Sequence, residues 1–252
     1  MDPPPKIERE FGVPFPGVVV DRAKWTQTAL KAMPAVGRLD WPTLFGRSAP
    51  VVLDLGCGNG RYLIASALAR PTHDHFGVDP LPVVVRYARK RGNQRGLANL
   101  KFAVLGGNEL LERYVEPGSV AEVHVYHPQP YYDPRQVHRR LITPAFLALV
   151  HRSLVPGGLF VIQTDNPGYR RYITQVVPVF FDFHERIGRW PDAPRGRTRR
   201  EIVALKRRLP VFRGTGTAKV GLGEGEAIRL AENLPPPVFD ADRRLRDLDR
   251  WG

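Results

Sequence analysis

The chain contains very little cysteine and no long apolar segment. Its only cysteine among 252 residues is Cys57, which excludes a disulfide framework and any zinc or iron–sulfur site built from several cysteines. No apolar run approaches the roughly 20 residues that a membrane-spanning helix needs. Residues 1–6 hold three prolines and an acid where a secretory signal would have basic and then apolar residues. We therefore expect a cytoplasmic protein that has no membrane partner.

Acidic residues are also scarce relative to basic ones. The chain has 38 Lys and Arg against 25 Asp and Glu, which gives a formal net charge of +13. Eleven of the basic residues lie between positions 186 and 219, beside only two acids. Such a local excess is typical of a surface that neutralises phosphates, so we predict that residues 186–219 dock a nucleic acid. A purely solvated basic face is the alternative interpretation.

Short apolar runs alternate with helix-like stretches from residue 51 onward. The pattern predicts strands at 51–55, 75–79, 100–105, 122–126 and 159–163, and helices at 61–69, 82–90, 144–154 and 168–177. This alternation is typical of an α/β fold with a Rossmann-like, doubly wound, mostly parallel sheet. Ligands of such sheets bind at the carboxyl ends of the strands. We therefore expect the chemistry in the loops that follow residues 55, 78, 126 and 163.

The segments outside this alternation complete the expected domain organisation. Residues 1–38 form an amino-terminal arm, extended at first and then helical from Asp21 to Met33. Residues 39–215 form the main domain and contain most of the basic docking segment. Residues 220–252 mix proline with charges of both signs, so we expect a flexible tail that includes at most a short helix.

A glycine-rich turn closes the first predicted strand of the main domain. It is Leu53-Asp54-Leu55-Gly56-Cys57-Gly58-Asn59-Gly60, and its glycines let the backbone approach a ligand closely. Asp79 ends the next strand, where a carboxylate can accept hydrogen bonds from both ribose hydroxyls. Neither the dinucleotide pattern nor a phosphate-binding Gly-Lys-Ser/Thr is present. An adenosine-type ligand without a pyrophosphate remains, and Asp54 can face a cationic group on it.

The turn and Asp79 resemble motif I and the ribose-binding acid of the class I S-adenosylmethionine-dependent methyltransferases. A second stretch, Tyr126-His127-Pro128-Gln129-Pro130-Tyr131-Tyr132, narrows the resemblance. It is similar to the Phe-Pro-Asp-Pro-Trp-Pro stretch of the bacterial tRNA (guanine-N7)-methyltransferases, and Arg139-Arg140-Leu141-Ile142 follows it as in that family. Thr164-Asp165 and Thr198-Arg199-Arg200-Glu201 also lie in family order. The resemblance covers about residues 39 to 215.

The resemblance implies the residues of the site. It implies S-adenosyl-L-methionine as cofactor and guanine 46 in the variable loop of tRNA as the substrate nucleotide. Gln129 stands at the catalytic position, where the family has aspartate. The implied cofactor-binding residues are Asp54, Gly56, Gly58, Asp79, Asn108 and Gln129. The implied substrate-binding residues are Asp165, Thr198, Arg199, Arg200 and Glu201. No metal is expected, tRNA is the expected partner, and a monomer is favoured.

Two departures from the family pattern bear on activity. Gln129 replaces an acid, and Asn108 is the nearest polar substitute for an acid that would contact adenine. Guanine N7 already carries a lone pair, so methylation there needs correct placement and no general base. A carboxylate would nevertheless stabilise the developing purine charge better than an amide. Two alternatives therefore stay open: a catalytically impaired tRNA-binding homologue, and a methyltransferase for another RNA or a small molecule.

Other interpretations of single residues also stay open. Asp165 is alternatively a cap at a strand end, and Glu201 a charge that stabilises a helix amino terminus. Tyr131 and Tyr132 either stack on a base or pack against the tail. His124 and His127 lack the spacing of a metal site, and Cys57 is explained by the need for a small residue in the turn.

Overall fold

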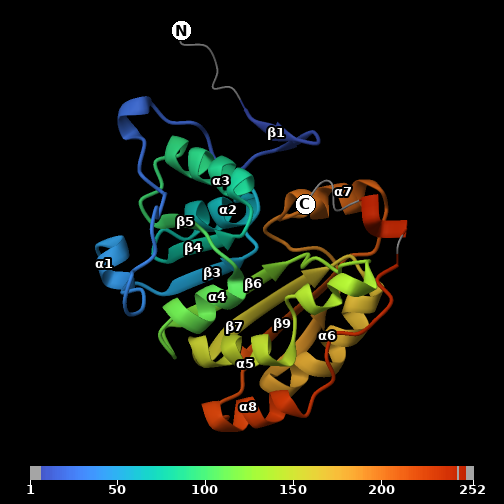
Figure 1. Cartoon of the computed structure of the whole chain (residues 1–252). Coiled ribbons are helices and arrows are strands. Elements are labelled where there is room, and N and C mark those ends of the chain that lie inside the picture. Colours follow the sequence, from blue (N-terminus) through green and yellow to red (C-terminus); the bar gives the residue numbers. More distant parts are fainter. Residues whose placement is uncertain (1–6, 243, 248–252) are drawn as a thin grey trace.

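A seven-stranded sheet organises the computed structural model, which describes residues 7–242 and 244–247. The strand order is β5-β4-β3-β6-β7-β9-β8 (Figure 1). The strands are β3 (Val51–Leu55), β4 (Asp74–Asp79), β5 (Leu100–Val104), β6 (Val120–Tyr126), β7 (Leu154–Thr164), β8 (Phe181–Arg186) and β9 (Phe212–Ala218). All pairs from β5 to β7 are parallel, whereas β9 pairs antiparallel with both neighbours. The predicted Rossmann-like, mostly parallel sheet is confirmed.

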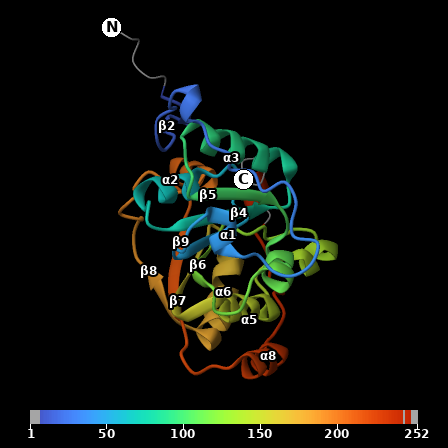
Figure 2. The same cartoon turned by 90° about the vertical axis from the view of Figure 1, so that its left-hand side faces the viewer.

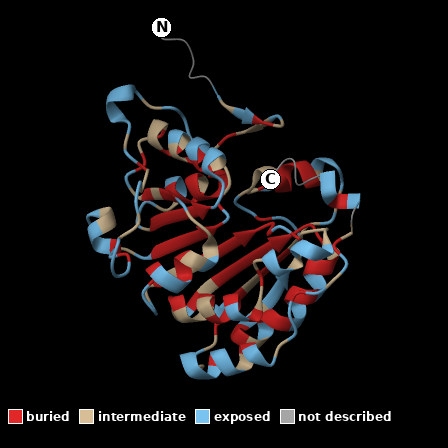
Figure 3. Cartoon of the chain, viewed as in Figure 1, coloured by how far each residue is buried: buried red, intermediate tan, exposed pale blue. Residues whose placement is uncertain are grey.

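Helices cover both faces of this sheet, so its central strands are buried, as Figure 3 shows. The helices are α1 (Trp41–Phe45), α2 (Arg61–Ala69), α3 (Pro82–Gln94), α4 (Gly107–Glu109), α5 (Pro144–Ser153), α6 (Pro167–Phe180), α7 (Arg199–Lys206) and α8 (Glu224–Glu232). Side chains of α2 and α3 pack on one face with Val52 and Phe102. Those of α5 and α6 pack on the other face with Leu53 and Phe160. Alternate residues of β3 therefore enter two cores.

The strand order reverses between β3 and β6, which are neighbours in the sheet. The chain leaves β3 toward β4 and β5 on one side and later returns to β6 on the other. Such a reversal leaves a crevice at the carboxyl ends of the two strands, where neither connection covers the sheet. The glycine turn after β3 and the proline-flanked loop after β6 both start at this place.

The predicted helix at 21–33 is wrong. Only Arg22–Lys24 forms a short 3-10 turn, and the chain beyond it runs along the edge strand β5. Phe102 N donates to Thr28 O at 2.7 Å, and Leu30 N donates to Phe102 O at 2.9 Å. The unpaired backbone groups of an edge strand need partners, and this pairing outweighed the helical spacing of the apolar side chains.

The first part of the arm is a folded hairpin instead of an extended segment. β1 (Arg9–Glu10) pairs with β2 (Val13–Pro14), and Phe15 beyond them is only 3% exposed. The guanidinium carbons of Arg91 and Arg95 lie 4.2 and 4.6 Å from the centre of the Phe15 ring. Residues 1–6 are also expected from the sequence to be extended, and these residues lie outside the described part of the chain.

The described part of the tail packs on the domain, which differs from the flexible tail expected for 220–252. α8 lies against α5, at the bottom of the molecule in Figures 1 and 2. Arg140, 2% exposed, donates to Pro237 O at 2.6 Å and to Phe239 O at 3.1 Å. Its guanidinium carbon is 3.7 Å from the Phe239 ring centre. These contacts have no local sequence signature, because the partners lie about a hundred residues apart.

No helix in the part of the chain that the structure describes is long and apolar enough to cross a membrane.

We expect Arg140→Ala to destabilise the protein by about 3–5 kcal/mol, because it strips four carbonyls, two of them in buried hydrogen bonds, of a charged donor. Two of these carbonyls, of Pro130 and Tyr131, belong to the loop after β6. The measurement is urea unfolding, together with protease cleavage in the segment 233–239. The exposed neighbour Arg139→Ala is the control and should shift stability by less than about 0.5 kcal/mol. Equal midpoints for the two variants would contradict the anchoring role.

Candidate functional site

The glycine turn between β3 and α2 leaves open space on one side. Gly56 and Gly58 have φ angles of 86° and 51°, which favour glycine. A Cβ atom added at either would meet nothing within 4 Å. Gly60 differs, because a Cβ there would lie 2.9 Å from both Ala88 and Phe102 side-chain atoms. Gly60 therefore serves packing, whereas Gly56 and Gly58 border a space that a ligand can enter.

Two carboxylates lie beside this turn, as the sequence predicts. Asp79 accepts hydrogen bonds from Gly58 N at 3.1 Å and from Leu81 N at 2.9 Å. Asp54 is 2% exposed, and its Oδ1 has no hydrogen-bond partner among the described residues. Burial, reinforced by repulsion from Asp79, raises the pKa of Asp54 well above its usual range. A buried carboxyl group that lacks a partner is stabilised by a cationic ligand group.

Cys57 in the same turn is unsuited to nucleophilic chemistry. Its side chain is buried, and burial together with the carboxylates of Asp54 and Asp79 raises the pKa of the thiol well above its usual range. The nucleophilic form of cysteine is the thiolate, which this environment disfavours. The explanation of Cys57 as a small residue in the turn is therefore sufficient.

Two exposed amides lie on the neighbouring loops. Asn108 is in α4, which begins just after β5, and a Cβ at the preceding Gly106 would meet nothing within 4 Å. Leu105 N donates to Asp79 O at 3.2 Å, which holds the start of this segment against the end of β4. Gln129 is exposed on the loop after β6. Both amides thus follow the carboxyl ends of their strands, Asn108 in α4 after β5 and Gln129 in the loop after β6, on the edge of the sheet where the crevice lies.

The loop that carries Gln129 has an unusual backbone. His127 and Tyr131 have φ angles of 52° and 45°, a region that residues other than glycine rarely adopt. His127 N donates to Gln163 O at 2.7 Å, and the Arg140 guanidinium binds the carbonyl of Tyr131. Such backbone strain persists only where surrounding contacts hold it in place. The position of Gln129 is therefore fixed by its neighbours on both sides.

A buried hydrogen-bonded chain determines the state of His127. Trp190 Nε1, which only donates, lies 2.6 Å from Gln163 Oε1 and so fixes the orientation of that amide. The Gln163 amide nitrogen lies 2.7 Å from His127 Nε2, which must therefore accept. The imidazole proton is then on Nδ1, which lies 3.3 Å from Asp165 Oδ1. Nothing in the sequence around His127 indicates this role, because Gln163 and Trp190 are distant along the chain.

Asp165, a predicted substrate-binding residue, is 1% exposed and has charged or polar neighbours at both oxygens. Arg200 Nε donates to its Oδ2 at 2.9 Å, and His127 is at Oδ1. Burial alone would raise the pKa of Asp165, but His127 and Arg200 lower it well below its usual range. Arg200, a second predicted substrate residue, is 4% exposed. In this conformation both side chains hold the end of β7 to α7.

The predicted substrate residues Thr198 and Glu201 stabilise the start of α7. Thr198 Oγ1 accepts a hydrogen bond from Glu201 N at 3.1 Å, and Glu201 Oε2 accepts one from Arg197 N at 2.7 Å. Glu201 Oε1 also accepts from Arg213 Nε at 3.1 Å. The Thr-x-x-Glu spacing is a capping-box signature, so sequence pattern alone contains this signal. Arg199 is half-buried, with its guanidinium carbon 5.4 Å from the Phe11 ring centre.

The basic segment 186–219 divides into structural and exposed members. Arg197, Arg200 and Arg213 form ion pairs with Asp192, Asp165 and Glu201. The exposed basic residues are Arg186, Arg189, Arg195, Lys206, Arg207 and Arg208. The charge of this segment available to a partner is therefore smaller than the sequence count indicates.

A second buried polar cluster lies under the crevice. His124 Nε2 is 2.9 Å from Glu122 Oε2, and its Nδ1 is 3.1 Å from Tyr126 Oη. Arg197 donates to the same Tyr126 hydroxyl at 2.9 Å. Its guanidinium carbon also lies 3.8 Å from the Trp190 ring centre. This cluster connects β6 to the basic segment, and no metal-binding group of three or more His, Cys, Asp or Glu side chains occurs in the described ranges.

Comparisons with known proteins find similarity to methyltransferases. A family model described as a putative methyltransferase matches residues 48–207. A tRNA (guanine-N(7)-)-methyltransferase of Halorhodospira halophila is 33% identical over 73% of this chain and 80% of its own length. One from Alcanivorax borkumensis is 33% identical over 68% of this chain and 72% of its own length.

Solved structures share the fold at lower identity. The 16S rRNA methyltransferase KamB has a TM-score of 0.54 and 18% identity, over 73% of this chain and 95% of that one. A 16S rRNA adenine-N1-methyltransferase from Catenulisporales acidiphilia, solved with S-adenosylmethionine, has a TM-score of 0.50 and 17% identity. This alignment covers 73% of the present chain and 94% of the Catenulisporales acidiphilia protein. At these identities the likeness shows the fold alone.

We expect Asp165→Asn to lower the free energy of unfolding by about 3–5 kcal/mol, because it removes the buried negative charge that accepts the hydrogen bond of Arg200 Nε and lies beside His127. The control is Asp192→Asn, which breaks the pair with Arg197 at a carboxylate that is 57% exposed. That change should cost less than about 1 kcal/mol. Chemical denaturation measures both. An Asp165 variant as stable as the wild type would contradict the stabilising role of this buried pair.

Proposed function

Because this chain belongs to the tRNA (guanine-N7)-methyltransferase family, we propose that it transfers a methyl group from S-adenosyl-L-methionine to N7 of guanine in tRNA. The nucleotide we propose is guanine 46 of the variable loop. One observation carries the proposal: the open glycine turn after β3 and the fixed Gln129 loop after β6 begin at neighbouring strands, where the strand order reverses. This arrangement supports a cofactor site and a transfer site that adjoin each other.

The residues around the glycine turn fit the cofactor. Asp54 offers a buried carboxylate oxygen without a hydrogen-bond partner in the described chain, and Gly56 and Gly58 leave room for a ligand. We propose that Asp79 binds the ribose hydroxyls and that Asn108 contacts adenine. When bound, S-adenosyl-L-methionine supplies a methyl group activated by a positively charged sulfur. Asp54 stabilises that positive charge or the charge of the amino group.

The transfer needs little chemistry from the protein side chains. Guanine N7 has an exposed lone pair, so no proton has to leave the base before it is methylated. The protein has to hold the purine in line and exclude water from the crevice. We propose that Gln129 orients the base through its amide, since its loop is held by the hydrogen bonds of His127 N to Gln163 O and of Arg140 to Tyr131 O.

The substrate side of the site rests on α7 and the segment before it. We propose that the exposed basic residues of 186–208 bind tRNA phosphates. Thr198 and Glu201 fix the first turn of α7, from which Arg199 faces the arm and Arg200 binds Asp165. Asp165, Thr198, Arg200 and Glu201 then act on the substrate by holding this helix end in place. Direct contact of Asp165 with guanine would require the Arg200 pair to open.

A second function is favoured by one residue. Gln129 carries no charge where the family has aspartate, which fits a homologue that binds tRNA but transfers methyl groups slowly or not at all. The buried ion pairs of α7 and the exposed basic residues would serve this protein equally well. The two proposals differ only in transfer, so an activity measurement separates them.

We expect S-adenosyl-L-methionine to bind more tightly as the pH rises, by up to about tenfold per pH unit below the pKa of Asp54. The sign follows from the raised pKa of Asp54 in the free protein, because a cationic ligand binds the ionised form and lowers that pKa. Calorimetric titrations between about pH 5 and 8 measure this. In Asp54→Asn the dependence should flatten, whereas an identical profile in both proteins would remove Asp54 from the cofactor site.

The transfer itself is tested with unmodified tRNA transcripts and isotopically labelled S-adenosyl-L-methionine. We expect label in 7-methylguanosine after digestion of the RNA. We also expect Gln129→Asp to raise the transfer rate by about tenfold or more, since a carboxylate stabilises the positive charge that develops on the purine. Gln136→Asp, an exposed position on the neighbouring 3-10 turn, is the matched control and should leave the rate unchanged.

Three outcomes separate the candidates. Label in another nucleoside would retain the enzyme class and change the substrate atom. Binding of both ligands without label, restored by Gln129→Asp, would identify the impaired homologue. A wild-type protein that binds neither ligand would contradict both proposals.

A further inference from the structure

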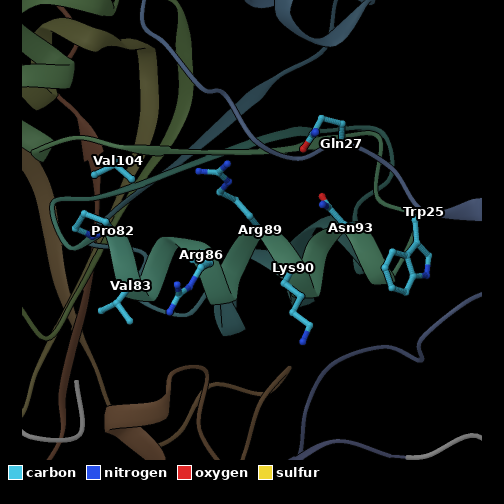
Figure 4. A pocket seen from close by; sticks show the side chains of 9 residues that line it. All are labelled: Trp25, Gln27, Pro82, Val83, Arg86, Arg89, Lys90, Asn93 and Val104. Atoms are coloured by element: carbon cyan, nitrogen blue, oxygen red, sulfur yellow. The ribbon is translucent and has the colours of Figure 1, made fainter. Parts of the chain in front are cut away.

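A groove runs between α3 and the segment of the arm that passes it. Its volume is about 730 Å³. The lining residues, which define the α3 groove, are Trp25, Gln27, Pro82, Val83, Arg86, Arg89, Lys90, Asn93 and Val104. Figure 4 shows Arg89 and Asn93 extending toward Gln27, with Arg86 and Lys90 extending from the other side of the helix in this view. Three of the nine lining residues are basic and none is acidic.

The basic residues of the α3 groove have no anionic partner in the described part of the protein. Within residues 7–242 and 244–247, no ion pair involves Arg86, Arg89 or Lys90. The same helix shows what a paired arginine does here: Arg91 Nη2 lies 2.7 Å from Glu8 Oε1, and Arg95 Nη2 lies 3.2 Å from Glu8 Oε2. The arm therefore neutralises one side of α3 and leaves the groove side positive.

The spacing of these residues suits an extended polyanion. Arg86, Arg89 and Lys90 are at positions i, i+3 and i+4, so they lie within about one turn of the helix, with Arg86 and Lys90 on one side and Arg89 on the other in Figure 4. Trp25 at the end of the groove is 40% exposed, and Tyr87, whose ring centre lies 5.9 Å from the guanidinium carbon of Arg86, is 52% exposed. Positive side chains interleaved with exposed aromatic rings are typical of surfaces that bind nucleic-acid strands.

The position of α3 connects this surface to the proposed reaction. Leu81 N, immediately before α3, donates to Asp79 Oδ1 at 2.9 Å, so the helix begins at the proposed ribose-binding carboxylate. Figure 1 shows α3 and α7 at the same end of the molecule, above the sheet in this view. A nucleic acid that reaches the crevice thus passes near two basic elements, α3 and the segment that contains α7. The count of basic residues along the sequence indicates only the second, at 186–219.

We propose that the α3 groove is a second tRNA-binding surface, in which Arg86, Arg89 and Lys90 contact backbone phosphates away from the methylated guanine. This inference rests on the proposed function, because tRNA is the polyanion that the family membership supplies. The groove adds affinity and fixes the orientation of the tRNA, and it takes no part in the transfer.

The experiment compares two double variants that remove the same charge. Arg86→Gln/Lys90→Gln changes the groove, and Arg171→Gln/Arg229→Gln changes exposed positions on α6 and α8 that do not line it. The dissociation constant for tRNA is measured across a salt series, with the cofactor affinity as a check on folding. Each lost phosphate contact should lower the salt slope by about 0.7–0.9.

We expect the groove variant to bind tRNA about five- to tenfold more weakly at about 0.1 M salt, with a salt slope lower by about 1.5. The control variant should match the wild type. In hydroxyl-radical footprinting, the groove variant should lose protection at one stretch of backbone while the remaining footprint persists. Its cofactor dissociation constant should not change.

Other outcomes overturn the inference in distinguishable ways. If the wild-type protein binds tRNA and the groove and control variants bind it with equal affinity, the tRNA-binding role of the α3 groove is overturned. The proposed function then still stands. A wild-type protein that fails to bind tRNA would overturn both. Binding of vesicles containing anionic phospholipid, lost in the groove variant while tRNA binding stays intact, would assign the groove to a lipid surface instead.

Discussion

Buried arginine side chains hold the segments around the sheet in place, and the rest of the structure depends on them. A guanidinium group stays charged, so its burial is tolerated only where several oxygens accept its hydrogen bonds. Arg140 meets this condition with four carbonyls, and Arg213 meets it with Glu201 and two further carbonyls. Arg61 does the same with Glu10 and the carbonyl of Pro14. The arm, the tail and α7 are each attached to the domain by such a residue.

This use of arginine changes the meaning of the net charge. Part of the basic charge is buried inside the protein, where acids such as Asp165 and Glu201 balance it, so these pairs add nothing to the net charge of +13. The part that a polyanion can reach lies on exposed residues of the segment 186–208 and on the groove side of α3. Composition alone gives the sum of both, and only the pairing pattern separates them.

The parallel core of the fold was predictable because its signals are local. The ranges of β3 and α2 agree with their apolar periodicity, and the glycine turn lies where its pattern indicates. β8 and β9 were missed, since residues 212–218 alternate glycine with polar residues. Gly214 is needed there because a Cβ would lie 2.2 Å from the Phe183 ring. Such a long-range packing constraint leaves no trace in a propensity pattern.

The candidate site also has features that local sequence signals predict and features that depend on long-range contacts. The carboxylates at the strand ends were predictable from position, whereas the partners of Asp165 were not, because His127 and Arg200 approach it from separate elements. The strained backbone at His127 and Tyr131 has one more consequence. Since these neighbours and Arg140 shape the loop, the exposed residue 129 between them contributes little to its conformation. A substitution at this position therefore changes the proposed base-orienting side chain without changing the loop conformation. Catalytic activity at residue 129 can thus evolve separately from the stability of the fold.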